Sequence, residues 1–313
     1  MSSNRRDVDI FEVGPRDGLQ NEARVVPTAI KLRLIQKLQD AGLEHLEVGA
    51  FVRPDRVPQM ADTETIFESL HRRGGRRARA QYWALVPNLH GLERAHALGV
   101  RSIGLFTAAT DGFTKRNIGM TVAESIRVFS EVIREARRYK MGVRAYVSTA
   151  FGCPFEGEVP ASKTLKVVRR LLGLGVDQIA ICDTIGVTDP RSIKDVFRPA
   201  LREAPGKRLA LHVHDTRGTA LACAVSALEL GVKVFDASVG GLGGCPFAPG
   251  AAGNLATEDL CYLFERMGVR TGIDRKKLYE TAQFISKAVK RPLTSRTSRA
   301  YFSASLEMRR RYL

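Results

Sequence analysis

Two histidines stand one residue apart in the apolar run LHVHD, residues 211 to 215. If this run is a β-strand, His212 and His214 point to the same face, and two rises of about 3.3 Å separate their Cα atoms by about 6.6 Å. Two imidazoles placed in this way can converge on one divalent cation. The alternative is a pair of hydrogen-bonded core histidines.

Oxygen ligands for such a cation stand in two other segments. Asp17 lies in GPRDGLQNE, directly after the first predicted strand, and Asn254 lies in the glycine-rich segment after the last one. A carboxylate and an amide oxygen beside two imidazoles, with no thiolate, favour Mg²⁺ or Mn²⁺ over a closed structural zinc site. The sequence therefore predicts a divalent metal cofactor held by Asp17, His212, His214 and Asn254.

Four more side chains near predicted strand ends are candidates for catalysis: Arg16, Glu47, Asp183 and Cys245. Arg16 is permanently charged and can stabilise negative charge that develops on a substrate oxygen. Cys245 lies in GLGGCP, and the glycines around it allow positive φ and a close approach to a ligand. These glycines are Gly240, Gly241, Gly243 and Gly244. We interpret the segment as a lid that brings a thiol to the substrate; the alternative is a tight turn around a buried cysteine.

Eight strand-like runs alternate with helix-like segments along the chain. The predicted strands cover 8–13, 45–50, 79–86, 102–107, 143–149, 178–183, 208–215 and 234–239. Apolar residues three and four apart predict helices over 28–42, 121–138, 161–173, 190–203, 217–230, 256–267 and 274–289. This alternation implies parallel strands joined by right-handed crossovers, and eight such units close into a TIM (β/α)8 barrel. An open doubly wound sheet is the alternative, but no G-x-G-x-x-G follows the first strand.

In such a barrel the carboxyl ends of all eight strands meet at one mouth, so candidates far apart in the sequence are predicted to form one site. No linker or composition shift divides the chain. We therefore expect a single catalytic domain over residues 1–313, with 255–313 as a C-terminal helical extension. An enzyme of this architecture is also expected to form a homo-oligomer, a dimer or a tetramer.

Composition limits the partners and the compartment. The 313 residues include 49 Lys+Arg against 33 Asp+Glu, a net charge of +16 that favours an anionic partner. No nucleic-acid-binding motif is present, so a phosphorylated small molecule is expected rather than DNA or RNA. Five cysteines without a C-x-x-C pair indicate a reducing compartment. With no secretory h-region and no apolar run of about 18 residues, we predict a cytoplasmic protein without a membrane partner.

Longer motifs resemble those of the 3-hydroxy-3-methylglutaryl-CoA (HMG-CoA) lyase family, metal-dependent carbon–carbon lyases on a TIM barrel. They are VGPRDGLQNE (13–22), FVRPDRVPQM (51–60), VPNLHGLERA (86–95), FTKRNI (113–118), GCPFEG (152–157), DTIGV (183–187), HVHDTRGTALA (212–222) and GLGGCPFAPGAAGNLATEDL (241–260). The R-D pair and H-x-H belong to a wider superfamily that includes condensing enzymes. GLGGCP together with GNLATED indicates the lyase branch.

The resemblance implies cleavage of HMG-CoA to acetyl-CoA and acetoacetate, as in leucine degradation, with the same four cation ligands. Arg16 would stabilise the thioester enolate. Cys245, with an ordinary pKa near 8.5, would supply a proton to the enolate carbon. His212 is the first candidate to accept the substrate's hydroxyl proton, with Asp183 or Glu47 as alternatives. Glu47, Asp183 and Glu258 are expected to orient the arginine, water and metal ligands.

Two segments depart from the family pattern. Gly49 and Ala50 stand where many relatives carry hydroxyl residues, and AICD (180–183) replaces a pattern of Ser, apolar, Gly, Asp, which adds the thiol of Cys182. These changes leave the acyl group of the CoA substrate open, with citramalyl-CoA or a longer-branched 3-hydroxyglutaryl-CoA as alternatives. A condensing enzyme that joins acetyl-CoA to a 2-oxo acid is the alternative reaction. GLGGCP and the lack of a clear C-terminal regulatory domain disfavour it.

Overall fold

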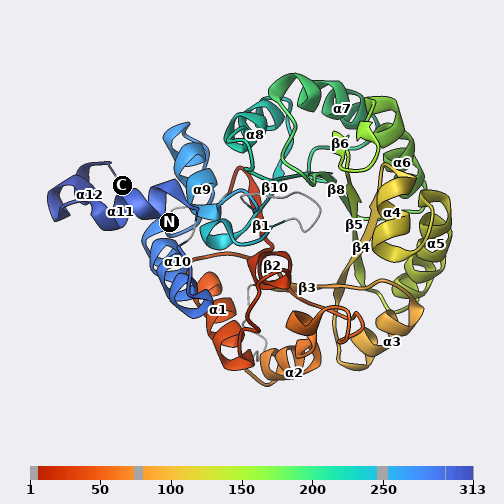
Figure 1. Ribbon diagram of the computed structural model, residues 1–313, viewed down its shortest axis with the longest axis horizontal. Coiled ribbons are helices and arrows are strands. Elements are labelled where there is room, and N and C mark those ends of the chain that lie inside the picture. Colours follow the sequence, from red (N-terminus) through yellow and green to blue (C-terminus); the bar gives the residue numbers. More distant parts are fainter. Residues whose placement is uncertain (1–5, 74–79, 245–252, 293, 313) are drawn as a thin grey trace.

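A closed barrel of eight parallel strands forms the centre of the molecule in a computed structural model, which describes residues 6–73, 80–244, 253–292 and 294–312 (Figure 1). Around the barrel the strands follow the order β1-β10-β9-β8-β5-β4-β3-β2. They are β1 (Asp9–Glu12), β2 (His45–Ala50), β3 (Gln81–Leu85), β4 (Ser102–Ala108), β5 (Gly142–Ser148), β8 (Gln178–Asp183), β9 (Leu209–Val213) and β10 (Val234–Ala237). The predicted TIM barrel and all eight predicted strands are confirmed.

Helices surround the barrel (Figure 1). They are α1 (Thr28–Asp40), α2 (Thr63–Arg73), α3 (Leu89–Ala97), α4 (Asp111–Ile118), α5 (Val122–Arg138), α6 (Ala161–Gly173), α7 (Pro190–Glu203), α8 (Ala220–Glu229), α9 (Thr257–Arg266), α10 (Arg275–Val289), α11 (Arg296–Ser303) and α12 (Leu306–Tyr312). Three short turns, η1 (Gly14–Gly18), η2 (Pro58–Met60) and η3 (Val239–Gly241), and a small hairpin of β6 (Gly152–Cys153) and β7 (Gly157–Glu158) complete the described elements.

All seven predicted helices are present, and five further helices were not predicted. Ile66, Phe67 and Leu70 recur at helical spacing in α2, so its signal was available in the sequence. The short helix α4 carries few apolar residues, which leaves little periodicity to detect. Local signals fix the better-defined boundaries. In α5 the Thr121 side chain and Glu124 form a capping box.

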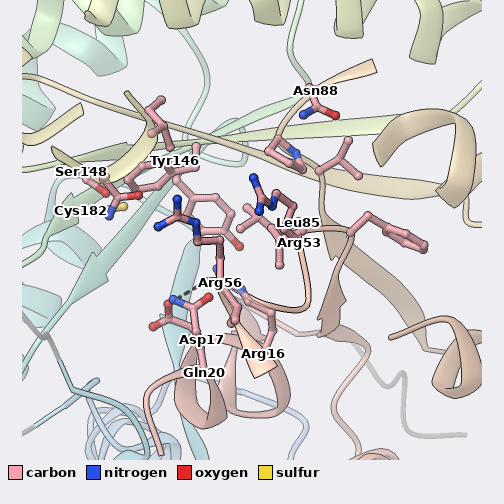
Figure 2. Close-up of a pocket in the computed structure, with 18 of the residues that line it drawn as sticks. Arg16, Asp17, Gln20, Arg53, Arg56, Leu85, Asn88, Tyr146, Ser148 and Cys182 are labelled. Atoms are coloured by element: carbon pink, nitrogen blue, oxygen red, sulfur yellow. Dashed lines mark hydrogen bonds and ion pairs between the residues drawn. The ribbon is translucent and has the colours of Figure 1, made fainter. Parts of the chain in front are cut away.

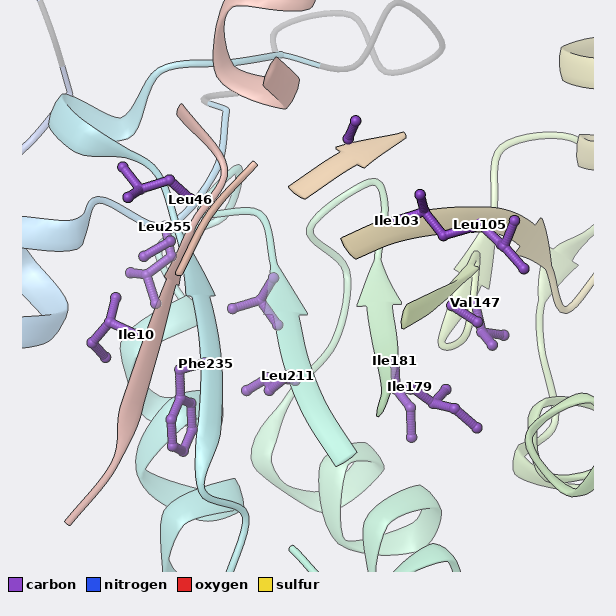
Figure 3. Close-up of a cluster of buried hydrophobic side chains, with 14 of the residues drawn as sticks. Ile10, Leu46, Ile103, Leu105, Val147, Ile179, Ile181, Leu211, Phe235 and Leu255 are labelled. Atoms are coloured by element: carbon purple, nitrogen blue, oxygen red, sulfur yellow. The ribbon is translucent and has the colours of Figure 1, made fainter. Parts of the chain in front are cut away.

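Alternation along the strands divides the apolar side chains into two layers. Leu211 on β9 and Ile179 and Ile181 on β8 point outward and pack under the helices, as Figure 3 shows. Ala180, Cys182 and Ala210 point inward, where aromatic rings including Phe11 and Trp83 fill the barrel; the centres of these two rings are 5.4 Å apart. Because the outer layer takes every second residue of β9, His212 and His214 belong to the inner face.

Four helices, α9 to α12, follow the last barrel strand (Figure 1). Helix α10 packs on α1, and α9 packs near α8 and α11. Among the residues that the structure describes, no helix combines the length and the apolar character that a membrane crossing requires.

Candidate active site

The side chains of Asp17, His212 and His214 meet at the carboxyl ends of the barrel strands. One potential ligand atom from each lies within 4.8 Å of the other two, and the two imidazole centres are 5.4 Å apart. Nδ1 of His214 is buried and has no hydrogen-bond partner among the described residues. Burial, and the proximity of His212, lower the pKa of His214 to about 4, so its ring is neutral near pH 7. A neutral, unsatisfied imidazole beside a carboxylate fits a cation site better than a satisfied core pair.

Asn254 joins this cluster through a bridge to the backbone of His214. Its Nδ2 donates to Asp17 Oδ2 at 2.9 Å and to the Leu242 carbonyl at 3.1 Å. These two bonds use the amide nitrogen and leave Oδ1 as the atom for a cation. Gly243, at φ 122°, allows the close approach, because a Cβ there would lie 2.5 Å from Asn254 Nδ2.

Arg16 and Asp17 project from η1, the turn that follows β1. Arg16 Nη1 donates to Asp17 Oδ1 at 2.7 Å, and the guanidinium lies 5.5 Å from the centre of the Tyr146 ring. Burial favours the neutral form of both side chains, but the charges of neighbouring residues outweigh the effect of burial in each case. Glu47 and Asp17 hold the pKa of Arg16 above its ordinary value. Arg16 and the two histidines lower the pKa of Asp17 to about 2, so Asp17 is anionic near neutral pH, as a candidate cation ligand requires.

Glu47 lies behind Arg16 on β2. Its side chain is fully buried, and its Oε2 accepts from Arg16 Nε at 2.6 Å and is also ion-paired with Nη2. Burial raises the pKa of Glu47 despite this partner. The strand has a register shift between Glu47 and Gly49, and a Cβ at Gly49 would lie 2.7 Å from Thr63 Cγ2. Through its contacts with Nε and Nη2, Glu47 positions Arg16, and Glu47 does not line the cavity.

Asp183 ends β8, but its carboxylate turns to its own loop. It accepts from the backbone N–H of Val187 at 3.0 Å and of Thr188 at 2.9 Å. By alternation, Asp183 shares the outward face of Ile179 and Ile181, whereas Cys182 faces inward. Burial raises the pKa of Asp183. The structure thus does not bring this predicted catalytic carboxylate to the cavity, which Cys182 and Thr184 line on either side of it.

A cavity of about 460 Å³ opens above the histidines. At one end lie Arg16, Asp17, His212 and His214. The Tyr146 ring centre is 6.3 Å from that of His212, Cys182 is the register partner of His212, and both line the cavity together with Ser148 (Figure 2). Much of the cavity wall is apolar, with Phe51, Leu85, Phe106, Phe113 and Phe129 among the lining residues. Toward the opening it is lined by Arg53, Arg56, Asn88, His90 and Arg94. Buried polar residues, an apolar wall and exposed arginines in one cavity suit a long ligand with an anionic tail.

The glycine-rich segment is described only in part. Gly240, Gly241 and Gly243 have φ values of 68°, 69° and 122°, so the predicted positive φ is confirmed at three of the four glycines. Gly244 lines the cavity, and its carbonyl accepts from Asn21 Nδ2 at 2.9 Å. Cys245 lies outside the described residues. The chain thus reaches the cavity wall one residue before the predicted proton donor.

Two buried glutamates join this segment to the strand ends. Glu258 accepts from the Gly240 N–H with both oxygens, at 2.8 and 2.9 Å, so it contacts the glycine segment rather than Arg16 or the cation ligands. Glu12, which the sequence interpretation left out, accepts from Gly14 N, Val239 N and Thr257 Oγ1. Its position as the last residue of β1 was a signal that we did not use.

The fold and this constellation define a TIM-barrel protein with a candidate divalent-metal centre at the mouth of the barrel. The chain belongs to the HMGL-like family, whose model matches residues 7–285. It is therefore a member of the group that its motifs resemble, and that expectation is confirmed.

Relatives and solved structures agree over nearly the whole chain. A rat protein named 3-hydroxy-3-methylglutaryl-CoA lyase, cytoplasmic, is 46% identical over 300 residues, which are 96% of this chain and 86% of the relative. A chicken protein named hydroxymethylglutaryl-CoA lyase, mitochondrial, is 45% identical over 94% and 97% of the two chains. The structure of a Pseudomonas aeruginosa hydroxymethylglutaryl-CoA lyase superposes with a TM-score of 0.91 at 40% identity, covering 96% and 100%. An HMG-CoA lyase from Acinetobacter baumannii in complex with coenzyme A and 3-methylmalate gives 0.88 at 35% identity, covering 96% of each chain.

Proposed function

We propose that this protein is a divalent-metal-dependent lyase that cleaves HMG-CoA to acetyl-CoA and acetoacetate. The observation that carries the proposal is the cluster of Asp17, His212 and His214, with Arg16 beside it, at the inner end of a cavity with a basic opening. The relatives named as HMG-CoA lyases support the same substrate. Mg²⁺ or Mn²⁺ is the proposed cofactor, because the ligands are two nitrogens and two oxygens.

Asp17, His212, His214 and Asn254 would hold the cation and, through it, the hydroxyl and carboxylate end of the substrate. When bound, the cation lowers the pKa of the tertiary hydroxyl group and so eases removal of its proton. The chain's own part is to supply one fixed anion and two imidazole nitrogens. Asp17 supplies that anion, because Arg16 keeps it ionised.

Arg16 is the group that we assign to the thioester oxygen. When the carbon–carbon bond breaks, its electron pair passes to the acetyl-CoA fragment as an enolate, and the former hydroxyl carbon becomes the ketone of acetoacetate. Glu47 and Asp17 hold the guanidinium in one orientation before the substrate arrives, so no reorganisation is needed as charge develops.

Two proton transfers complete the reaction. The hydroxyl proton goes to a base, and His212 remains the first candidate because it lines the cavity, whereas Glu47 and Asp183 do not. A metal-bound imidazole is a poor base, so in this role His212 Nε2 would take the proton in place of the cation, which Asp17, His214 and Asn254 would continue to hold. We assign those two carboxylates to positioning Arg16 and the 184–188 loop. The enolate carbon then takes a proton, for which Cys245 is the proposed donor. No covalent acyl-enzyme is required.

The basic opening supports a CoA thioester as the substrate class, since Arg53, Arg56 and Arg94 can attract its phosphates. The relatives' names favour HMG-CoA over related 3-hydroxyacyl thioesters. Cys182 and Ser148 line the reactive end, so the size and polarity of the acyl group are selected there. A homo-oligomer, a cytoplasmic location and a role in leucine degradation stay predictions; the relatives carry both cytoplasmic and mitochondrial names.

The decisive experiment incubates the purified protein with a panel of 3-hydroxyacyl-CoA thioesters and identifies the products by mass. We expect HMG-CoA to yield acetyl-CoA and acetoacetate, with activity lost on chelation and restored by Mg²⁺ or Mn²⁺. The Cys245→Ala variant should bind Mn²⁺ normally, but its kcat should be about 100-fold lower if the thiol is the acid. A parallel incubation supplies acetyl-CoA with a 2-oxo acid. Release of free CoA there, together with no carbon–carbon cleavage of any 3-hydroxyacyl-CoA in the panel, would replace the lyase by the condensing reaction.

A further inference from the structure

Two charged residues without a role so far, Asp236 and Arg144, lie behind His212 in the barrel interior. Asp236 on β10 is the register partner of His212 on the neighbouring strand β9. Its Oδ2 lies 3.1 Å from His212 Nδ1, and its Oδ1 is ion-paired with Arg144 Nη2. Both Asp236 and Arg144 are fully buried. The three side chains therefore form a continuous line from the barrel centre to the proposed metal site.

The surroundings of Arg144 keep this line rigid. Its guanidinium carbon lies 3.8 Å from the centre of the Phe11 ring and 5.0 Å from that of Tyr146. Its Nη1 donates to Gln178 Oε1 at 2.5 Å. An arginine stays charged even when buried, so Asp236 is its anionic partner. An ionised carboxylate only accepts hydrogen bonds, and the Nδ1 of His212 must therefore be the donor.

We propose that Asp236, held in place by Arg144, is a positioning residue that fixes His212 in the Nδ1–H tautomer and so directs the lone pair of Nε2 toward the cavity. A neutral imidazole carries one ring proton, and the nitrogen without it is the one that can bind a cation or accept a proton. Neither Asp236 nor Arg144 lines the cavity, so both act through His212. The inference rests on the metal site proposed above.

A purely structural role explains this arrangement less well. A buried ion pair has a large desolvation cost, and apolar residues of similar volume commonly serve equally well in a core. The residues around Arg144 are aromatic and apolar, so apolar side chains in place of Arg144 and Asp236 could pack against them. Among the described residues, His214 has no partner on its Nδ1, so His212 is the member of the pair whose tautomer is set by a carboxylate.

The substitution Asp236→Asn distinguishes the positioning role of Asp236 from a purely structural role, because it changes the shape of the side chain very little. Arg144 requires an acceptor, so the amide oxygen of the new side chain will face Arg144 and its NH₂ group will face His212. His212 Nδ1 must then accept, and the ring proton moves to Nε2, where it blocks the lone pair. We expect Mn²⁺ affinity, measured by electron paramagnetic resonance titration, to fall about 10- to 100-fold.

A second variant tests the direction of that effect. In the double variant Arg144→Met with Asp236→Asn, the guanidinium that would hold the amide oxygen is gone. The amide oxygen can then turn back to His212 Nδ1. Mn²⁺ affinity should therefore recover at least severalfold relative to Asp236→Asn alone, which loss of core packing would not produce. Gln178→Leu is the matched control. It removes a different partner of Arg144, and we expect lower thermal stability with unchanged Mn²⁺ affinity.

The wild-type protein provides a test that depends on no variant. In metal-free protein labelled with ¹⁵N-histidine, the ring nitrogens of His212 should show the Nδ1–H tautomer, with the resonance assigned by its loss in His212→Gln. An Nε2–H tautomer there, or unchanged Mn²⁺ affinity in folded Asp236→Asn, overturns the positioning role while leaving the metal site intact. Failure of the wild-type protein to bind Mn²⁺ would instead reject the metal site itself.

Discussion

Glu47, which does not line the cavity, accepts a hydrogen bond from Arg16 Nε at 2.6 Å, while Asp17 accepts one from Nη1 of the same guanidinium at 2.7 Å. Two carboxylates thus hold both edges of the Arg16 guanidinium. Only Asp17 lines the cavity. The consequence is that the orientation of Arg16 depends on a residue outside the cavity.

Glu47→Gln should slow catalysis although it leaves the cavity wall unchanged. The amide keeps the shape of the side chain but removes the charge that holds Arg16, and we expect kcat to fall about tenfold or more with a smaller change in KM. The double variant Arg16→Met with Glu47→Gln should be no slower than Arg16→Met alone, because Glu47 acts through Arg16. Steady-state kinetics of the three variants decide the point. Losses that multiply in the double variant would mean that Glu47 acts independently.

Asp17→Asn should remove most of the cation affinity. The amide cannot supply the charge of an anionic ligand, so Mn²⁺ binding should weaken by at least about 100-fold, since even outer residues of a metal site cost 10- to 100-fold. Calorimetric titration measures this directly. Asp62→Asn is a suitable control, because Asp62 is ion-paired with the buried Lys31 at 2.7 Å outside the cavity. Equal Mn²⁺ affinity in the two variants would contradict the proposed ligand set.

Glu12 predicts a pH dependence of stability. Burial raises its pKa to about 7 in the folded protein, against an ordinary value near 4.5, so the folded state binds the proton more tightly between these values. The free energy of unfolding should therefore decrease as pH rises from about 4.5 to 7, by up to about 3 kcal/mol from this group. Protonated Glu12 can donate to Thr257 Oγ1 and still accept from Gly14 and Val239.

Glu12→Gln mimics the protonated side chain and cannot ionise. In urea unfolding, the stability of this variant relative to the wild type should improve between pH 5 and pH 8. Glu131→Gln, on the exposed face of α5, is the control for a general change of charge. A constant difference between Glu12→Gln and the wild type across this range would show that Glu12 is ionised in the folded protein throughout.

Arg56→Gln should weaken binding of the CoA ester without slowing the chemical step. Arg56 and Arg53 are exposed residues that line the cavity (Figure 2). Loss of one cation near the phosphates should raise KM about 3- to 10-fold, with kcat nearly unchanged and a weaker dependence of KM on salt. Arg169→Gln removes an exposed arginine paired with Glu203 outside the cavity and should leave KM unchanged. A fall in kcat alone would place Arg56 at the reacting end instead.

The sequence by itself determined the barrel and the orientation of the histidine pair. Side chains in a strand alternate with a period of two, and eight parallel strands bring their carboxyl ends to one mouth, so His212, His214 and Asp17 were predicted to meet. The same alternation could have shown that Asp183 faces away from Cys182, a signal that our interpretation did not apply.

Only the tertiary structure decided which buried charges serve the site. Asp236 lies in an apolar strand run and cannot be distinguished from a core residue until its partners are known; Arg144 is 92 residues away in sequence and His212 is 24. Glu47 likewise became a partner of Arg16 through a contact between β2 and the turn after β1. Local sequence patterns fix the face on which a side chain lies. The pairing of two charges depends on closure of the barrel, which places neighbouring strands in register.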